Sequence, residues 1–139
     1  MHEWALAEGV VATVLDMAKK QNIKIITGIN IKIGQLQGIE KEVVRFALKE
    51  IVKPNPMMSK KLKVRIREEK AVFKCKVCGR QWRLPDVKAA LNPLTSEAIH
   101  FVPEVAYAYI NCPGCKSPDF EMLEGRELWI ESVTGERGG

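Results

Sequence analysis

Residues 23–33 read IKIITGINIKI, with isoleucine or threonine at every odd position. Most of the even positions hold polar or small residues, so the pattern repeats every two residues. Successive side chains of a strand point to opposite faces of a sheet, and this period therefore predicts a long strand with one buried face. A single strand of this kind cannot fold alone, and its neighbours must supply the rest of the core.

Helical patterns flank this strand on both sides. Residues 5–20 carry apolar side chains at spacings of three and four and end in lysines, which predicts an amphipathic helix. Residues 39–52 predict a second helix, and Pro54 stops it. The side chains that the second helix is expected to bury are Val43, Val44, Ala47, Leu48, Ile51 and Val52. Both helices need a sheet on which to bury these faces, and about three strands are the minimum.

Further strand patterns occur along the rest of the chain. They lie at 62–67, 72–73, 105–110, 120–123 and 127–133. The last two stand on either side of a turn signal at 124–125. Segments 86–92 and 96–101 predict short helical turns, which Pro93 and Pro103 break.

Composition and length narrow the class of protein. The 139 residues suffice for one ordinary domain, or for a small domain plus a metal-stapled module. A content of 46% hydrophobic and 28% charged residues is typical of globular rather than disordered chains. No apolar stretch approaches the roughly 20 residues of a membrane-spanning helix, and no secretory signal pattern is visible. We therefore expect a cytoplasmic protein without membrane contact, in which thiols stay reduced.

The four cysteines occur in two CxxC pairs, Cys75-Lys76-Val77-Cys78 and Cys112-Pro113-Gly114-Cys115. Each pair presents two thiolates from one tight loop, so two pairs predict a closed tetrahedral site, typical of structural zinc. Gly79 and Gly114 are expected to ease the backbone through these turns. The segment 79–111 between the pairs exceeds the roughly 15–20 residues of the compact pattern and indicates an insertion. The duplicated pair argues against a thioredoxin-like redox motif, whereas iron in the same cage stays open.

The order of these elements predicts the fold class. We expect an α+β protein: a small mixed sheet packed by two helices, with an inserted four-cysteine zinc-ribbon domain. The α/β part should comprise residues 1–70 plus 120–139, and the metal-binding part residues 71–119.

The N-terminus offers a second set of metal ligands. The amine of Met1, the amide nitrogen of His2 and its imidazole can form fused chelate rings, which nickel(II) and copper(II) favour. The Glu3 amide or another imidazole would complete the square. His100, the second of two histidines, lies between apolar residues in the long segment between the cysteine pairs. Such histidines are more often solvated or packed than ligands, and the residues alone leave both readings open.

Several motifs in one order resemble a known family. They are Met1-His2-Glu3-Trp4-Ala5-Leu6, Ile33-Gly34-Gln35-Leu36, Val44-Arg45-Phe46-Ala47-Leu48 and the paired CxxC motifs. Together they are similar to the HypA (HybF) family of hydrogenase-maturation nickel chaperones, over nearly the whole chain. The resemblance implies a nickel-binding α/β domain (1–70 plus 120–139) and a structural zinc domain (71–119).

The resemblance also implies a function. The chain would deliver Ni(II), together with a maturation GTPase of the HypB type, to the large subunit of a [NiFe] hydrogenase. Some members of the family serve urease as well. By position, His2 and Glu3 match the nickel-binding start of the family, and the four cysteines Cys75, Cys78, Cys112 and Cys115 match its zinc motif. Segment 79–111 departs from the compact members; if it folds back to the N-terminus, His100 would be the fourth nickel donor. A homodimer also stays open.

The main rival is a zinc-ribbon protein that binds nucleic acid. Its support is a basic stripe made of Lys60, Lys61, Lys63, Arg65, Arg67, Lys70 and Lys74. The alternation of these cations with Leu62, Val64 and Ile66 is explained equally well by the solvated face of a strand. An enzyme is a poorer interpretation, because the chain has no GxxxxGK[ST], GxSxG or HExxH motif. We therefore expect a metallochaperone that is not itself an enzyme.

Overall fold

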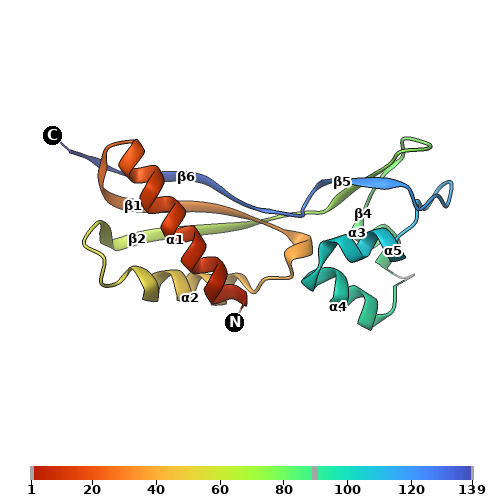
Figure 1. The fold of residues 1–139 in the computed structure, drawn as a ribbon, viewed down its shortest axis with the longest axis horizontal. Coiled ribbons are helices and arrows are strands. Elements are labelled where there is room, and N and C mark those ends of the chain that lie inside the picture. The colour runs from red at the N-terminus through yellow and green to blue at the C-terminus, as the bar shows by residue number, and fades with distance from the viewer. Residues whose placement is uncertain (1, 89–90, 139) are drawn as a thin grey trace. The chain divides into compact units, whose positions relative to one another are not determined.

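The computed structural model describes residues 2–88 and 91–138 (Figure 1). Packing divides the chain into two compact units. Unit 1 comprises the chain up to Lys32, Ile39–Arg67 and the chain from Trp129, and unit 2 comprises Ile33–Gly38 and Glu68–Leu128. Residues 33–38 and 120–128 therefore pack with the cysteine module rather than with the N-terminal helices. No helix in the described part of the chain is long and apolar enough to cross a membrane.

Unit 1 is a three-stranded sheet with two helices against it (Figure 1). Its helices are α1 (His2–Lys20) and α2 (Lys41–Val52), which pack against each other. Its strands, in spatial order, are β2 (Met58–Glu69), β1 (Ile23–Gly34) and β6 (Leu128–Arg137). Both predicted helices and the predicted long strand are therefore present.

The helices bury most of the side chains that their spacing predicts, although Ile51 of α2 is only half-buried. The buried side chains of α1 are Ala7, Val10, Val11, Val14 and Ala18, and those of α2 are Val44, Ala47, Leu48 and Val52. Val43, which we expected to be buried, is exposed together with Phe46 one turn later. These two residues form a separate row on α2, and Phe46 meets Trp4 of α1 edge to face, with ring centroids 6.1 Å apart.

Strand β1 departs from its predicted alternation at residues 25–28. Ile29, Ile31 and Ile33 are buried as expected, but Ile26 is buried where Thr27 was expected to point inward. Between these parts Gly28 is covered by β6: a Cβ atom added there would lie 2.4 Å from the hydroxyl oxygen of Thr134. The close approach of a neighbouring side chain explains the glycine and the local break in the pattern.

Unit 2 is built on a second three-stranded sheet. Its strands, in spatial order, are β4 (Gln81–Arg83), β3 (Val72–Cys75) and β5 (Phe120–Glu124), paired antiparallel. Its helical segments are η1 (Gln35–Gln37), α3 (Leu84–Lys88), α4 (Pro93–Phe101), η2 (Pro103–Val105) and α5 (Ala106–Tyr109). The core of the sheet is aromatic: Phe73, Trp82 and Phe120 lie with ring centroids 5.5–5.7 Å apart.

Two predictions for the segment between the cysteine pairs are wrong. Residues 105–110 form the end of η2 and then α5 instead of a strand. There, Ala106 is buried and Tyr107 stacks on Phe120 at 4.9 Å, so packing on the aromatic core overrides the alternating pattern. Pro93 begins α4 rather than breaking a helix, because proline fits the first helical turn and Asn92 caps it by accepting from the amide of Thr95 at 2.7 Å.

Candidate metal sites

The structure brings the sulfur atoms of the four cysteines together. Cys75 ends β3 and Cys78 lies in the turn that follows it, whereas Cys112 and Cys115 lie in the loop that leads to β5. All four sulfurs lie within 4.8 Å of one another. Between the pairs, Cys75 Sγ lies 3.5 Å from Cys115 Sγ, and Cys78 Sγ lies 3.6 Å from Cys112 Sγ.

In the first pair, the backbone wraps around the leading sulfur. The amides of Val77 and Cys78 both donate to Cys75 Sγ at 3.4 Å. The amide of Gly79 donates to the carbonyl of Cys75 at 3.1 Å and closes the turn. Gly79 has φ +76°, the left-handed region in which glycine is preferred.

The second pair repeats this geometry residue by residue. The amides of Gly114 and Cys115 donate to Cys112 Sγ at 3.3 and 3.5 Å, and the amide of Lys116 donates to the carbonyl of Cys112 at 2.9 Å. The residue that closes this turn in the left-handed region is Lys116, with φ +66°, and not the expected Gly114. No sequence signal marks a lysine for this conformation.

These hydrogen bonds lower the pKa values of the first thiol of each pair, Cys75 and Cys112. The amide of Cys78 is the largest influence on Cys75 and lowers its thiol pKa against the effect of burial. Burial raises the pKa of Cys112, but the amides of Cys115 and Gly114 and the neighbouring thiols outweigh it and bring that pKa to about 6. These hydrogen bonds thus favour the thiolate form of Cys75 and Cys112, which is the form that binds metal.

The trailing thiol of the second pair has the opposite shift. The amide of Ser117 lowers the pKa of Cys115, but the other three thiols and burial raise it to about 11. Once its neighbours carry negative charge, a further thiolate so close to them is unfavourable. A bound cation would remove this penalty, because it compensates the charge of the whole cluster.

The cluster fits a four-coordinate metal ion of the zinc or iron type. Four sulfurs about 2.3 Å from a tetrahedral centre would lie about 3.8 Å from one another, close to the separations seen here. A disulfide would need about 2.05 Å, and the four cysteines are free thiols. Within the described residues, this is the one convergent group of three or more cysteine, histidine or carboxylate ligands.

The predicted nickel ligands are described only in part. Met1 and the side chains of His2 and His100 lie outside the described residues, which leaves the backbone positions of the two histidines on α1 and α4. His2 and Glu3 occupy the first turn of α1, where backbone N–H groups have no partner within the helix. Glu3 is half-buried.

Comparisons with known proteins agree with this arrangement. The model of the family "Hydrogenase/urease nickel incorporation, metallochaperone, hypA" matches residues 1–135. The hydrogenase maturation factor HypA of Thermococcus onnurineus is 42% identical over 139 residues, covering 100% of this chain and 99% of the relative. HypA of Pyrococcus abyssi is 43% identical over 137 residues, covering 99% of this chain and 97% of the relative.

A comparison of folds finds a similar architecture at lower sequence identity. The solution structure of the Ni metallochaperone HypA from Helicobacter pylori superposes with a TM-score of 0.63 at 19% identity, and the match covers 98% of each chain. This likeness confirms the predicted α+β fold, and the relatives confirm the resemblance noted in the sequence. The chain belongs to the HypA family of hydrogenase/urease nickel-incorporation metallochaperones.

Proposed function

We propose that this chain binds Ni(II) at its N-terminus and, with a partner GTPase of the HypB type, delivers it to the large subunit of a [NiFe] hydrogenase. The match to the nickel-incorporation family over residues 1–135 carries this proposal. Residues 1–70 plus 120–139 act as the nickel-binding domain, and residues 71–119 as the zinc-binding domain. The chain itself is not an enzyme, and the GTPase supplies any nucleotide chemistry.

The nickel donors are the amine of Met1, the amide and imidazole of His2, and a fourth group from Glu3 or His100. The place of His2 and Glu3 in the first turn of α1 supports this assignment. Their amides can bind a metal without breaking a hydrogen bond of the helix. Loading displaces protons from these nitrogens, so nickel affinity should fall as the pH drops.

The resident metal is zinc, held by Cys75, Cys78, Cys112 and Cys115. Its support is the convergence of four sulfurs at near-tetrahedral separations, with backbone amides aimed at the leading sulfur of each pair. Zinc in such a site cross-links the two loops and leaves no open position for catalysis. Four free thiols also suit the reducing cytoplasm, where we place the protein.

The test is nickel loading of untagged protein, with nickel and zinc counted per chain. His2→Ala should abolish the visible absorption of a planar nickel–nitrogen complex while the zinc content stays unchanged. If His100 is the fourth donor, the matched variant His100→Ala should weaken nickel binding without changing the zinc content, and added imidazole should partly restore binding by filling the vacant position. Parental nickel affinity in this variant would instead leave Glu3, or water, as the fourth donor. Undiminished nickel binding by His2→Ala, or by protein with an N-terminal tag, would count against the proposal.

A further inference from the structure

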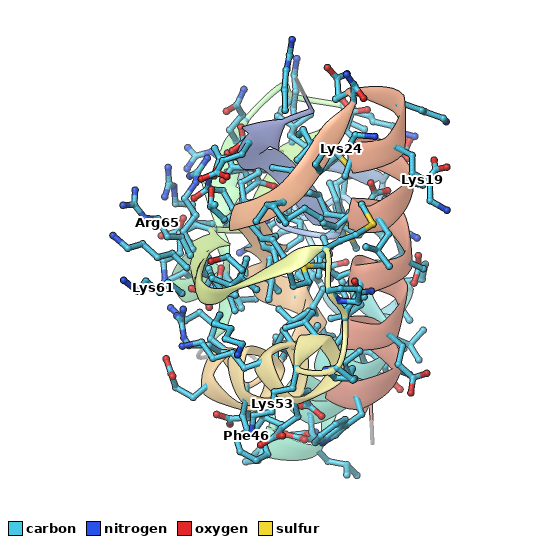
Figure 2. All side chains as sticks on the ribbon, turned by 90° about the vertical axis from the view of Figure 1, so that its left-hand side faces the viewer. Lys19, Lys24, Phe46, Lys53, Lys61 and Arg65 are labelled. Carbon is cyan, nitrogen blue, oxygen red and sulfur yellow. The ribbon has the colours of Figure 1, made fainter. Side chains whose placement is uncertain are left out.

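The sheet of unit 1 has a groove on the face that its two helices do not cover. The groove has a volume of about 510 Å³. Its floor is β1 around Gly28 and Asn30, and one wall is β2 with Lys61, Lys63 and Arg65. Figure 2 shows Lys61 and Arg65 projecting on the side of the sheet opposite α1.

The three cations of this wall are not neutralised. Lys61, Lys63 and Arg65 are exposed, and no acidic side chain in the described part of the chain forms an ion pair with them. The next cation along β2, Arg67, differs because Glu131 binds it at two points. Uncompensated charge along a hollow surface attracts an anionic ligand and speeds its association.

The spacing of the cations matches one kind of anion. They occupy alternate positions on one strand and therefore recur about every 6.6 Å along one face. A peptide in extended conformation repeats its own side chains at the same interval. Acidic residues at every second position of such a peptide would each meet a cation, while the polar groups of Thr27 and Asn30 on the floor can bond to its backbone.

Nucleic acid fits this groove less well. Proteins that bind single strands place aromatic side chains under successive bases, in addition to cations along the backbone. Among the described residues that line the groove, none is aromatic.

Addition of a partner strand at the free edge of β2 is also disfavoured. Lys63 directs its carbonyl toward β1, since that oxygen lies 3.7 Å from a Cβ atom built on Gly28. The carbonyl of Val64 therefore points to the free edge, because successive carbonyls alternate along a strand. The guanidinium of Arg45 on α2 already donates to it. A partner would therefore engage the face of the sheet rather than its edge.

We propose that this groove docks an extended segment of a partner protein that carries acidic residues at alternate positions. The docking surface uses no residue of either metal site, so it adds a protein-binding function to the proposed nickel delivery. The docking proposal can therefore be tested independently of nickel binding.

The test uses the zinc-loaded full chain and a fluorescent peptide of alternating glutamate and serine. About eight residues suffice to span Lys61 to Arg65 at about 3.3 Å per residue. Fluorescence anisotropy at about 50 mM salt, where surface charges are weakly screened, measures the affinity. The variant Lys61→Glu/Arg65→Glu should lose about tenfold or more in affinity, because attraction at two contacts becomes repulsion.

The matched control is Lys19→Glu/Lys24→Glu, which changes the net charge equally. Both lysines are exposed, and neither lines the groove (Figure 2). The control should keep the affinity of the parent chain within about twofold. Thermal melting of both variants checks the fold; if the glutamate variant is unfolded, the milder Lys61→Gln/Arg65→Gln, with Lys19→Gln/Lys24→Gln, gives the same comparison.

Four results would overturn the proposal. The first is no binding of the alternating peptide by the parent chain. The second is an equal loss in the control variant, which would reduce the effect to net charge. The third is equal binding of a peptide with the same residues in two blocks, which would remove the role of spacing. The fourth is tighter binding of an oligothymidylate of similar length, which would assign the groove to nucleic acid.

Discussion

Arg67 on β2 and Glu131 on β6 form a two-point ion pair across the central strand β1. The guanidinium Nε and Nη2 atoms each lie 2.7 Å from one carboxylate oxygen. Two parallel bonds fix the relative position of the two strands better than a single bond would, although partial exposure weakens the attraction. The bond from Arg67 is also the main reason why the pKa of Glu131 is lowered.

This shift makes the stability of unit 1 depend on pH. A carboxyl whose pKa is lower in the folded chain stabilises the fold above its unfolded pKa of about 4.3. That contribution is lost as the pH falls through the folded pKa. The variant Glu131→Gln should therefore melt below the parent chain at neutral pH, and the difference should shrink in acid. Melting curves at several pH values measure this.

Glu8→Gln is the control, because Glu8 is an exposed carboxylate on α1 that makes no ion pair with any described residue. Its melting temperature should follow the parent chain at every pH. If the melting temperature of Glu131→Gln stayed below that of the parent chain by the same amount down to acid pH, the shape of the side chain, and not the ionised carboxylate, would account for the effect.

At the scale of elements, the two cysteine loops share one geometry but differ in the residue that closes each turn. Gly79→Ala places a Cβ atom at φ +76° with nothing within 4 Å, so the change acts on backbone conformation alone. It should cost about 1–2 kcal/mol. Lys116→Gly removes the corresponding strain at φ +66° and should gain up to about 1 kcal/mol, after the greater freedom of glycine in the unfolded chain is subtracted.

Melting of the zinc-loaded chain measures both changes. Gly114→Ala is the control, since Gly114 is not in the left-handed region and its added Cβ meets only the flexible side chain of Arg80. Its effect should be smaller than that of Gly79→Ala. A Lys116→Gly variant that melted lower than the parent would mean that the bond from Lys116 Nζ to the carbonyl of Pro113, 3.3 Å long, outweighs the backbone strain.

Sequence patterns predict those elements whose packing is local. The helices α1 and α2 and the second half of β1 follow from spacing, because each buries one face against its neighbours. The segment 105–110 could not be predicted, because its helical turn depends on Phe120, a residue distant in sequence. Strands β5 and β6 flank one turn signal, as expected, yet they join different sheets, which no local pattern specifies.

The candidate sites likewise differ in how much of their geometry the sequence predicts. The CxxC spacing predicts that the cysteine sulfurs converge, since two short loops must present paired thiols. The left-handed Lys116 carries no signal in the sequence. The groove arises where β1, β2 and β6 lie side by side, so its residues come together only through strand order. The nickel donors stay a prediction, carried by the family match.

At the scale of the whole molecule, the two units have separate cores of different composition. Unit 1 buries mainly aliphatic side chains from its helices and sheet. Unit 2 buries an aromatic cluster together with Cys75 and Cys112 in one core. Two of the four cysteines that we propose as metal ligands are therefore part of its packing. Metal binding at these cysteines would be coupled to the folding of unit 2, whereas unit 1 has a core of its own.

Removal of the proposed zinc ion should therefore unfold unit 2 while unit 1 stays largely folded. The tryptophans report on this separately: Trp82 in unit 2 is 3% exposed, whereas Trp4 and Trp129 in unit 1 are 39% and 52% exposed. In a Trp4→Phe/Trp129→Phe variant, a strong chelator should shift the emission of Trp82 to longer wavelength as water reaches the indole. In the converse Trp82→Phe variant, emission from Trp4 and Trp129 should change little, and most of the helical circular dichroism should remain.

Cys112→Ala should act like the chelator, because it leaves three thiolates, weakens zinc retention and removes a buried side chain from the core of unit 2. Zinc added back should restore the buried emission of Trp82 in the chelated parent but not in this variant. That contrast separates loss of metal from damage by the chelator. If Trp82 emission stayed unchanged in metal-free protein, unit 2 would fold on its aromatic core alone, and the assignment of a structural role to the metal would be wrong.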